Sequence, residues 1–410
     1  MDKILYSLMS KLDVKWSDHL KIVLLGIDAL DWRLLTNYIE KGLMPNFKKV
    51  FERSARGILK TDPFSPIAWT SIATGKFKDK HGINHFVDEK GNLLTGEDVK
   101  VKRLWEILTE QGKSVGVFGW LLLYPVKPLN GFAVGDFHFA KHIDFCYPKF
   151  LYYFLPKFDD VEIAKRFTDF TPVRDYKKRF EYGSEEWIYN HLFFRRLVTP
   201  LKEDETIRRM AWKLLRRFKP EVCLFYLKGI DYVCHGFWAF SFPEEFKGYK
   251  TIQINEKGIK SFGNVIERYY RYVDKFLGEL MFFLSDKSIL FIVSDHGARA
   301  MREDEIKLKG KDFEVFLTGT HRDGGVFIAY GNDIKPGDKG EIRDVDIVPT
   351  ILWLLGLPVA KDMDGRILED IFERPLEISY VDSYDDGLER KHIEVKEEEV
   401  IERLKGLGYL

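Results

Sequence analysis

The stretch IVLLGID, residues 22–28, decides the fold of this sequence. An uninterrupted apolar run that ends in an acid is typical of a strand that is buried on both faces and leads into a loop. The stretch ILFIVSDHG, residues 289–297, has the same form and ends in Asp295, His296 and a glycine. Open α/β sheets bind their ligands at the carboxyl ends of their strands. Asp28, Asp295 and His296 are therefore predicted to meet at one edge of a sheet.

Strand and helix patterns alternate through the first and last thirds of the chain. Further strands are predicted at 57–60, 114–120, 222–227 and 326–330, and helices at 32–51, 103–109, 207–218, 265–283 and 347–355. This βαβ rhythm predicts a mostly parallel sheet with helices on both faces, which is a three-layer α/β/α fold.

Residues 121–200 differ from the rest of the chain. They are dense in aromatic side chains, as in FCYPKFLYYF at 145–154, and show no sustained periodicity, so they are predicted to form a cap inserted into the core. The predicted organisation is an N-terminal helix at 1–20, a core in two parts at 21–120 and 201–375, the aromatic-rich cap at 121–200, and an acidic C-terminal tail at 376–410 that ends in a docking helix.

Composition excludes several classes of partner. Of the 410 residues, Lys+Arg and Asp+Glu number 64 each, so no overall field favours a nucleic acid duplex. The three cysteines are an odd number without metal-finger spacing, which predicts reduced thiols in a cytoplasmic protein. The charged residues among the first twenty argue against a signal peptide, and no uncharged segment reaches the length of a membrane span. The oligomeric state stays open.

Three further metal-type side chains follow strands. Asp231 and His235 come after the strand at 222–227, and because they are four residues apart, one helical turn would place them on the same side. His321 lies in GTHRDGG, residues 319–325, which is predicted to be a flexible loop. Singly, each residue has an ordinary alternative as a helix cap, a turn former or an exposed side chain. Together with the strand-end acids they indicate a hydrolase with two metal ions.

A candidate nucleophile lies in SPIAWTSIATG, residues 65–75. Ser65 before a proline predicts a helix start with Ser65 as N-cap, where the positive end of the helix favours an alkoxide and an anionic phosphoryl group. Thr70 is the competing hydroxyl, but its place within the helix predicts a bond back to a carbonyl. The backbone N–H groups of Ile67 and Ala68 are candidate oxyanion donors.

These motifs, in combination and in order, resemble those of the alkaline phosphatase superfamily, and within it the type I phosphodiesterase and nucleotide pyrophosphatase family. The resemblance covers residues 21–90 and 220–370 and leaves out the cap. It rests on GID at 26–28, SPIAWTSIATG at 65–75 with KHGI at 80–83, DYVCH at 231–235, SDHG at 294–297, GTH at 319–321, DIVPTIL at 346–352 and DMDGR at 362–366.

The resemblance implies a role for each candidate. One divalent ion would be held by Asp231, His235 and His321, and the other by Asp28, Asp295 and His296 together with the nucleophile Ser65. Mixed histidine and carboxylate ligands fit Zn²⁺ best, with Mn²⁺ as the alternative. The implied activity is hydrolysis of a small phosphate ester, a nucleotide or another phosphodiester, through a phosphoseryl intermediate.

Other functions use the same fold. A phosphomonoesterase or a metal-dependent phosphomutase of the superfamily would need the same two ions. A catalytically silent binding module is the alternative from another class, although the intact set of six ligands argues against it. The substrate and the identity of the metal stay open.

Overall fold

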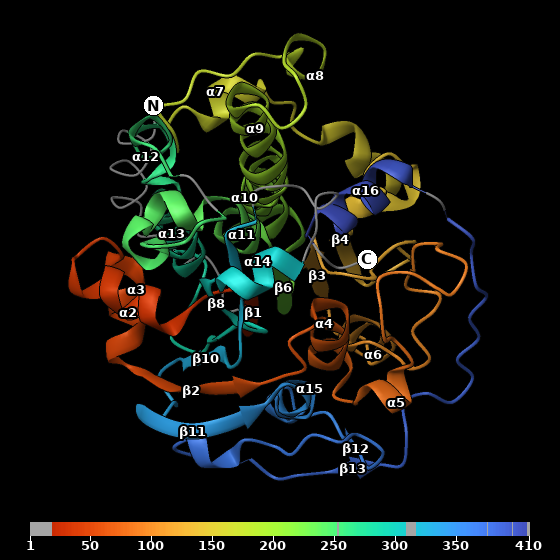
Figure 1. The fold of residues 1–410 in the computed structure, drawn as a ribbon. Helices are drawn as coiled ribbons and strands as arrows, with labels where there is room; N and C mark the ends of the chain where they lie inside the picture. Colours follow the sequence, from red (N-terminus) through yellow and green to blue (C-terminus); the bar gives the residue numbers. More distant parts are fainter. Residues whose placement is uncertain (1–18, 252–253, 309–316, 375, 396, 408–410) are drawn as a thin grey trace.

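A computed structural model describes residues 19–251, 254–308, 317–374, 376–395 and 397–407, and its centre is a nine-stranded sheet (Figure 1). The N-terminal helix predicted at 1–20 falls almost wholly outside the described residues. In spatial order the strands are β11 Gly337–Arg343, β2 Ser54–Lys60, β10 Gly325–Tyr330, β7 Ile289–Val293, β1 Ile22–Ile27, β6 Val222–Leu227, β3 Val115–Phe118, β4 Gly131–Val134 and β5 Cys146–Tyr147.

The sheet is mostly parallel, as predicted. β1 runs parallel to both of its neighbours, β6 and β7, and the pairs β3–β6, β3–β4 and β2–β11 are parallel too. β10 is antiparallel to β2 and β7, and β5 is antiparallel to β4. Because β1 has a parallel neighbour on each side, the carboxyl ends of β6, β1 and β7 lie next to one another.

Both faces of the sheet are covered, which confirms the three-layer α/β/α architecture. Alternate residues of β1 pack into two different apolar clusters, with Val23 in one and Leu24 in the other. The first cluster includes α2 Trp32–Glu40, α3 Pro45–Glu52, α10 Thr199–Phe218, α11 Gly229–Ser241, α12 Glu256–Phe262 and α13 Val265–Met281. The second includes α4 Ser65–Thr74, α6 Leu104–Glu110, α15 Ile347–Leu354 and α16 Glu398–Leu407.

The segment 32–51 and the edge strand β11 differ from the sequence-based prediction. The single helix predicted at 32–51 is wrong, because Gly42 adopts a left-handed conformation with φ of 72° and Pro45 starts a second helix, so the segment forms α2 and α3. β11 was missed, since its sequence GDKGEIR is largely polar and the strand lies at the exposed edge of the sheet.

Residues 121–200 contribute to the sheet and also form short helices. β4 and β5 extend the edge beside β3. The helical elements of this segment are η1 Phe137–Phe139, η2 Ile143–Phe145, η3 Lys149–Phe154, α7 Asp160–Ala164, α8 Tyr176–Arg179, α9 Glu185–His191 and the π-helix η4 Leu192–Val198. The division into core and cap stays a prediction.

The remaining elements are short. They are α5 Lys78–His81, α14 Glu303–Leu308, η5 Pro243–Phe246, η6 Asp344–Asp346, η7 Glu369–Ile371, the pair β8 Gly297–Ala300 and β9 Gly319–Arg322, and the pair β12 Val359–Ala360 and β13 Tyr380–Val381. Among the described helices, none combines the length and the apolar character that a membrane span requires.

Candidate metal centre

The six predicted metal-type side chains form two groups of three. Within each group the candidate ligand atoms lie within 4.8 Å of one another. The helix–hairpin group consists of Asp231, His235 and His321, and the strand-end group consists of Asp28, Asp295 and His296. Both groups lie at the carboxyl edge of β6, β1 and β7, where the strand-end pattern of the sequence predicts them.

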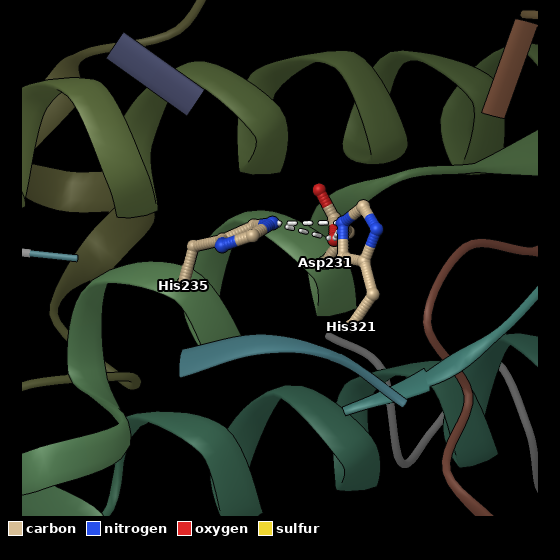
Figure 2. Close-up of side chains that lie close together, drawn as sticks. All are labelled: Asp231, His235 and His321. Atoms are coloured by element: carbon tan, nitrogen blue, oxygen red, sulfur yellow. Dashed lines mark hydrogen bonds and ion pairs between the residues drawn. The ribbon is translucent and has the colours of Figure 1, made fainter. Parts of the chain in front are cut away.

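The helix–hairpin group converges on one point (Figure 2). Asp231 and His235 are one turn apart on α11, as predicted, and His321 approaches from β9. The Nε2 atom of His235 lies 3.2 Å from Asp231 Oδ1 and 3.1 Å from His321 Nε2. His321 Nε2 is 3.5 Å from the same carboxylate oxygen. Two imidazole nitrogens and a carboxylate oxygen that face one another suit a shared cation.

His321 is placed by a strand, so the prediction of a flexible loop is wrong. β9 pairs antiparallel with β8 and runs against α11. A Cβ atom on Gly319 would lie 2.1 Å from the carbonyl oxygen of Cys234, so only glycine permits this approach. His235 Nδ1 lies 2.9 Å from the Gly319 carbonyl oxygen. A proton donated there leaves the Nε2 lone pair pointing into the group.

The strand-end group is fully buried. His296 Nε2 lies 3.4 Å from Asp28 Oδ1 and 3.4 Å from Asp295 Oδ2. His296 Nδ1 is 3.1 Å from the Gly297 carbonyl oxygen, which again leaves Nε2 as the free lone pair. Neither Asp28 Oδ1 nor His296 Nε2 has a hydrogen-bond partner within the described part of the chain. Buried polar atoms are rarely left unpaired, so these atoms fit a cation between them.

Two aromatic side chains hold the strand-end carboxylates. The Tyr226 hydroxyl donates to Asp28 Oδ2 at 2.5 Å, and Trp69 Nε1 donates to Asp295 Oδ2 at 3.0 Å. The two rings pack edge to face with centroids 4.7 Å apart. Trp69 reaches this position by lying on β1, where a Cβ atom at Gly26 would be 2.4 Å from its ring. Gly26 in β1 thus leaves room for the ring of Trp69, so that this residue of α4 can donate a hydrogen bond at the site.

Electrostatics at the site also favours a cation. Burial, together with the charges of Asp295 and Asp231, holds the pKa of Asp28 well above its ordinary value. Burial acts to raise the pKa of Asp231 too, but the charge of His235 holds that pKa well below its usual range. Burial lowers the pKa of His235 and brings that of His296 to about 4. The ring of His296 is therefore neutral at pH 7, which is the form of a histidine that binds metal ions.

Ser65 is the first residue of α4 and is 2% exposed. The N-cap is Phe64, so the prediction that Ser65 caps the helix is wrong; the carbonyl of Phe64 already accepts the N–H groups of Ile67 and Ala68, at 2.9 and 3.1 Å. The same bonds contradict the expectation that these two N–H groups are oxyanion donors. Among the described residues, the Ser65 hydroxyl has no hydrogen-bond partner.

Thr70 differs from Ser65 in this respect. Its hydroxyl donates to the carbonyl of Pro66 at 2.6 Å, which confirms the predicted bond within the helix. Of the two hydroxyls, that of Ser65 is the one without a hydrogen-bond partner in the described part of the chain.

A cavity next to Ser65 encloses about 270 Å³ of free space, part of it open to solvent. Its lining comprises Asp28, Ser65, Phe86, Leu121, His138, Tyr226, Lys228, Asp231, Tyr232 and Leu404. Lys228 and His138 are the two basic side chains of this lining. Each is paired with a carboxylate, Lys228 with Glu203 and His138 with Asp136.

The sequence patterns did not predict Lys228, His138 or the supporting aromatic residues. Lys228 directly follows β6, so the strand-end rule would have found it if the rule had been applied to cations as well as to metal ligands. Leu404 comes from α16, nearly at the other end of the chain, and no local pattern indicates its contact with the site.

Comparison with known proteins agrees with this geometry. The family model for type I phosphodiesterase/nucleotide pyrophosphatase matches residues 22–347. A mutant of the alkaline phosphatase PafA is similar in structure, with a TM-score of 0.55 and 13% identity over 87% of this chain and 99% of that one. Human ectonucleotide pyrophosphatase/phosphodiesterase 5 is similar with a TM-score of 0.50 and 13% identity over 86% of this chain and 100% of its own. At such identities the two structures show a shared fold. None of the curated proteins matches the sequence.

Proposed function

This chain belongs to the type I phosphodiesterase/nucleotide pyrophosphatase family of the alkaline phosphatase superfamily, and from that premise we propose that it hydrolyses phosphodiesters through a phosphoseryl intermediate with the help of two divalent metal ions. Family membership makes it a phosphoester hydrolase. One observation carries the finer proposal. The unpartnered hydroxyl of Ser65 lines the same cavity as Asp28 and Asp231, one carboxylate from each group.

The two groups are the proposed metal sites. The helix–hairpin group would hold one ion, and the strand-end group with Ser65 would hold the other. Their fit rests on the unpaired Asp28 Oδ1 and His296 Nε2 atoms and on the two histidines whose Nδ1 atoms face carbonyl oxygens. Zn²⁺ suits this mixture of ligands best, with Mn²⁺ as the alternative. When bound, the ions supply Lewis acidity that polarises phosphoryl oxygens and lowers the pKa of a coordinated hydroxyl.

The chain's own residues account for the order of bond changes. Ser65 Oγ attacks phosphorus from the N-terminus of α4, where the helix dipole favours the anionic group. The bond from phosphorus to the leaving oxygen breaks, and the proton that Ser65 gives up goes to that oxygen, so the group departs as an alcohol. Water then attacks the phosphoseryl ester, the bond from phosphorus to Oγ breaks, and Ser65 regains its proton. Tyr226 and Trp69 keep the strand-end carboxylates in place through both steps.

We further propose a small phosphorylated substrate, a nucleotide or another diester, and a cytoplasmic location. The location rests on Cys146, Cys223 and Cys234, which are all free and buried, as is usual in a reducing compartment.

The proposed activity predicts a preference between two chromogenic esters. Protein stripped of metal and given back Zn²⁺ or Mn²⁺ is expected to cleave bis-p-nitrophenyl phosphate with a higher kcat/KM than p-nitrophenyl phosphate. Release of p-nitrophenolate from each ester measures this directly. A preference for the monoester would reassign the chain to the phosphomonoesterases of the superfamily. Metal-dependent turnover of neither ester would leave a phosphomutase or a silent binding module.

Tyr226→Phe is expected to weaken binding of the ion in the strand-end group by about tenfold to a hundredfold, because hydrogen bonds to ligating carboxylates orient them. The ring stays and the 2.5 Å bond to Asp28 is lost. Titration calorimetry of the metal-free protein with Zn²⁺ measures the affinity without relying on turnover.

Tyr269→Phe is the matched control for this measurement. It also removes a buried tyrosine hydroxyl that donates to an aspartate, Asp204, at 2.8 Å, but Asp204 belongs to neither group. Its metal affinity should equal that of the unmodified protein. Equal affinities in all three proteins would show that Tyr226 has no part in holding the ion.

A further inference from the structure

The cavity beside Ser65 is closed on one side by the C-terminal helix. Leu404 of α16 is 1% exposed and lines the cavity together with Ser65 and Asp28. Val400, one turn earlier, is buried in the same apolar cluster as Leu404 but is not part of the lining. A residue close to the end of the chain thus forms a wall of the space in which a substrate would bind.

The segment that leads into α16 is firmly attached to the rest of the molecule. Arg390 donates to the carbonyl of Gly96 at 2.6 Å and forms an ion pair with Glu106 at 2.8 Å. The backbone N–H of Leu93 donates to the carbonyl of Val395 at 3.0 Å.

Directly before α16, Glu397 lies 2.9 Å from His142 Nε2 and 3.7 Å from Lys141 Nζ. Figure 1 shows α16 beside the chain near β4, in agreement with these contacts. They give Leu404 a defined position over the cavity.

The two metal-type groups contribute unequally to the lining of the cavity. Asp231 is part of the lining, but His235 and His321 are not. Ser65 lines the cavity together with Phe86 and Leu404. In-line attack by Ser65 expels the group opposite its hydroxyl, so a substituent that lies in this cavity beside Ser65 is one that is retained.

The size of the cavity limits that substituent. Its free space of about 270 Å³ includes an opening to solvent, so the enclosed part is smaller than this value. Leu404 occupies part of the wall of this space. A nucleoside on the phosphoryl group is therefore expected to meet its side chain sooner than a methyl group would.

We propose that Leu404 is a specificity-determining residue, which restricts the retained substituent of the substrate to small groups. This inference rests on the proposed function. It identifies the preferred substrates as diesters with one small substituent and places the limit in a single side chain of α16.

Two diesters with the same leaving group test the proposal: methyl p-nitrophenyl phosphate and the p-nitrophenyl ester of thymidine 5′-phosphate. The unmodified protein should prefer the methyl ester in kcat/KM. Leu404→Ala should raise the ratio of nucleoside ester to methyl ester by about tenfold, since a few methylene groups in a pocket typically change selectivity by 10- to 200-fold. Leu404→Phe should lower the same ratio.

Val400→Ala is the matched control, because it shortens a buried apolar side chain of the same helix without altering the cavity wall. Its selectivity ratio should stay unchanged. An unchanged ratio in Leu404→Ala, or an equal rise in Val400→Ala, would overturn the role of Leu404. If the unmodified protein cleaves neither diester in a Ser65-dependent manner, the proposed function itself fails, which is a distinct result.

Discussion

Ser65→Ala is expected to reduce kcat/KM for bis-p-nitrophenyl phosphate by about 10⁴-fold or more, because a chain that acts through a covalent intermediate has no substitute for its nucleophile. Ser65 is 2% exposed, and its hydroxyl has no hydrogen-bond partner in the described part of the chain. Mass spectrometry of protein quenched in acid during turnover should find the phosphoryl adduct on the peptide with residue 65 in the unmodified protein only.

Thr70→Ala is the control for this result, since it removes the other hydroxyl of the same helix. Loss of its 2.6 Å bond to the Pro66 carbonyl should lower the free energy of unfolding by about 1 kcal/mol and change kcat/KM by no more than about threefold. Loss of activity in Thr70→Ala with full activity in Ser65→Ala would reverse the assignment of the nucleophile.

Removal of the metal ions should have the second largest effect. Chelation is expected to lower kcat/KM by about 10³-fold or more, because a bound ion typically contributes several kcal/mol of transition-state stabilisation. It should also destabilise the fold, since the buried carboxylate of Asp28 then lies beside those of Asp295 and Asp231 without the ion. Zn²⁺ at a hundred times its Kd should restore about 2.7 kcal/mol of stability. Thermal unfolding with and without Zn²⁺ measures this gain.

Asp295→Asn and Asp274→Asn separate the loss of a ligand from the loss of a buried carboxylate. Asp274 is 3% exposed and accepts the N–H groups of Asn46 and Phe47 at 3.0 and 2.8 Å, away from both groups. Asp295→Asn should bind one ion per chain instead of two by elemental analysis. Asp274→Asn should be less stable yet bind two. A full complement of two ions in Asp295→Asn would contradict the proposed strand-end site.

The parts of the site that sequence alone predicts are those attached to long buried strands. Asp28 and Asp295 follow apolar runs whose parallel pairing is the ordinary outcome for such segments, so their shared edge could be inferred. Asp231 and His235 are four residues apart, which is about one helical turn. Their position on one side of a helix could therefore be inferred as well.

Other positions depend on tertiary contacts that no local pattern contains. His321 lies in a four-residue strand that exists because Gly319 lets it approach α11. The Phe64 carbonyl accepts the first hydrogen bonds of α4. Ser65 therefore lies in the first turn of the helix and not at the predicted N-cap position. The periodicity at 397–404 predicts a helix, but its contact with the cavity joins residues more than three hundred positions apart.

The origin of the ligands determines when the ions can bind. Asp28 and Asp295 meet only after β1 and β7 have paired, and these strands come from opposite ends of the sequence. In an unfolded chain, chelation by such distant residues would have to close a very long loop, with the corresponding loss of entropy. Unlike a zinc finger, whose closely spaced ligands let the metal template the fold, this chain must assemble its sheet first. The ions would therefore bind after the chain has folded. They would slow its unfolding without accelerating its folding.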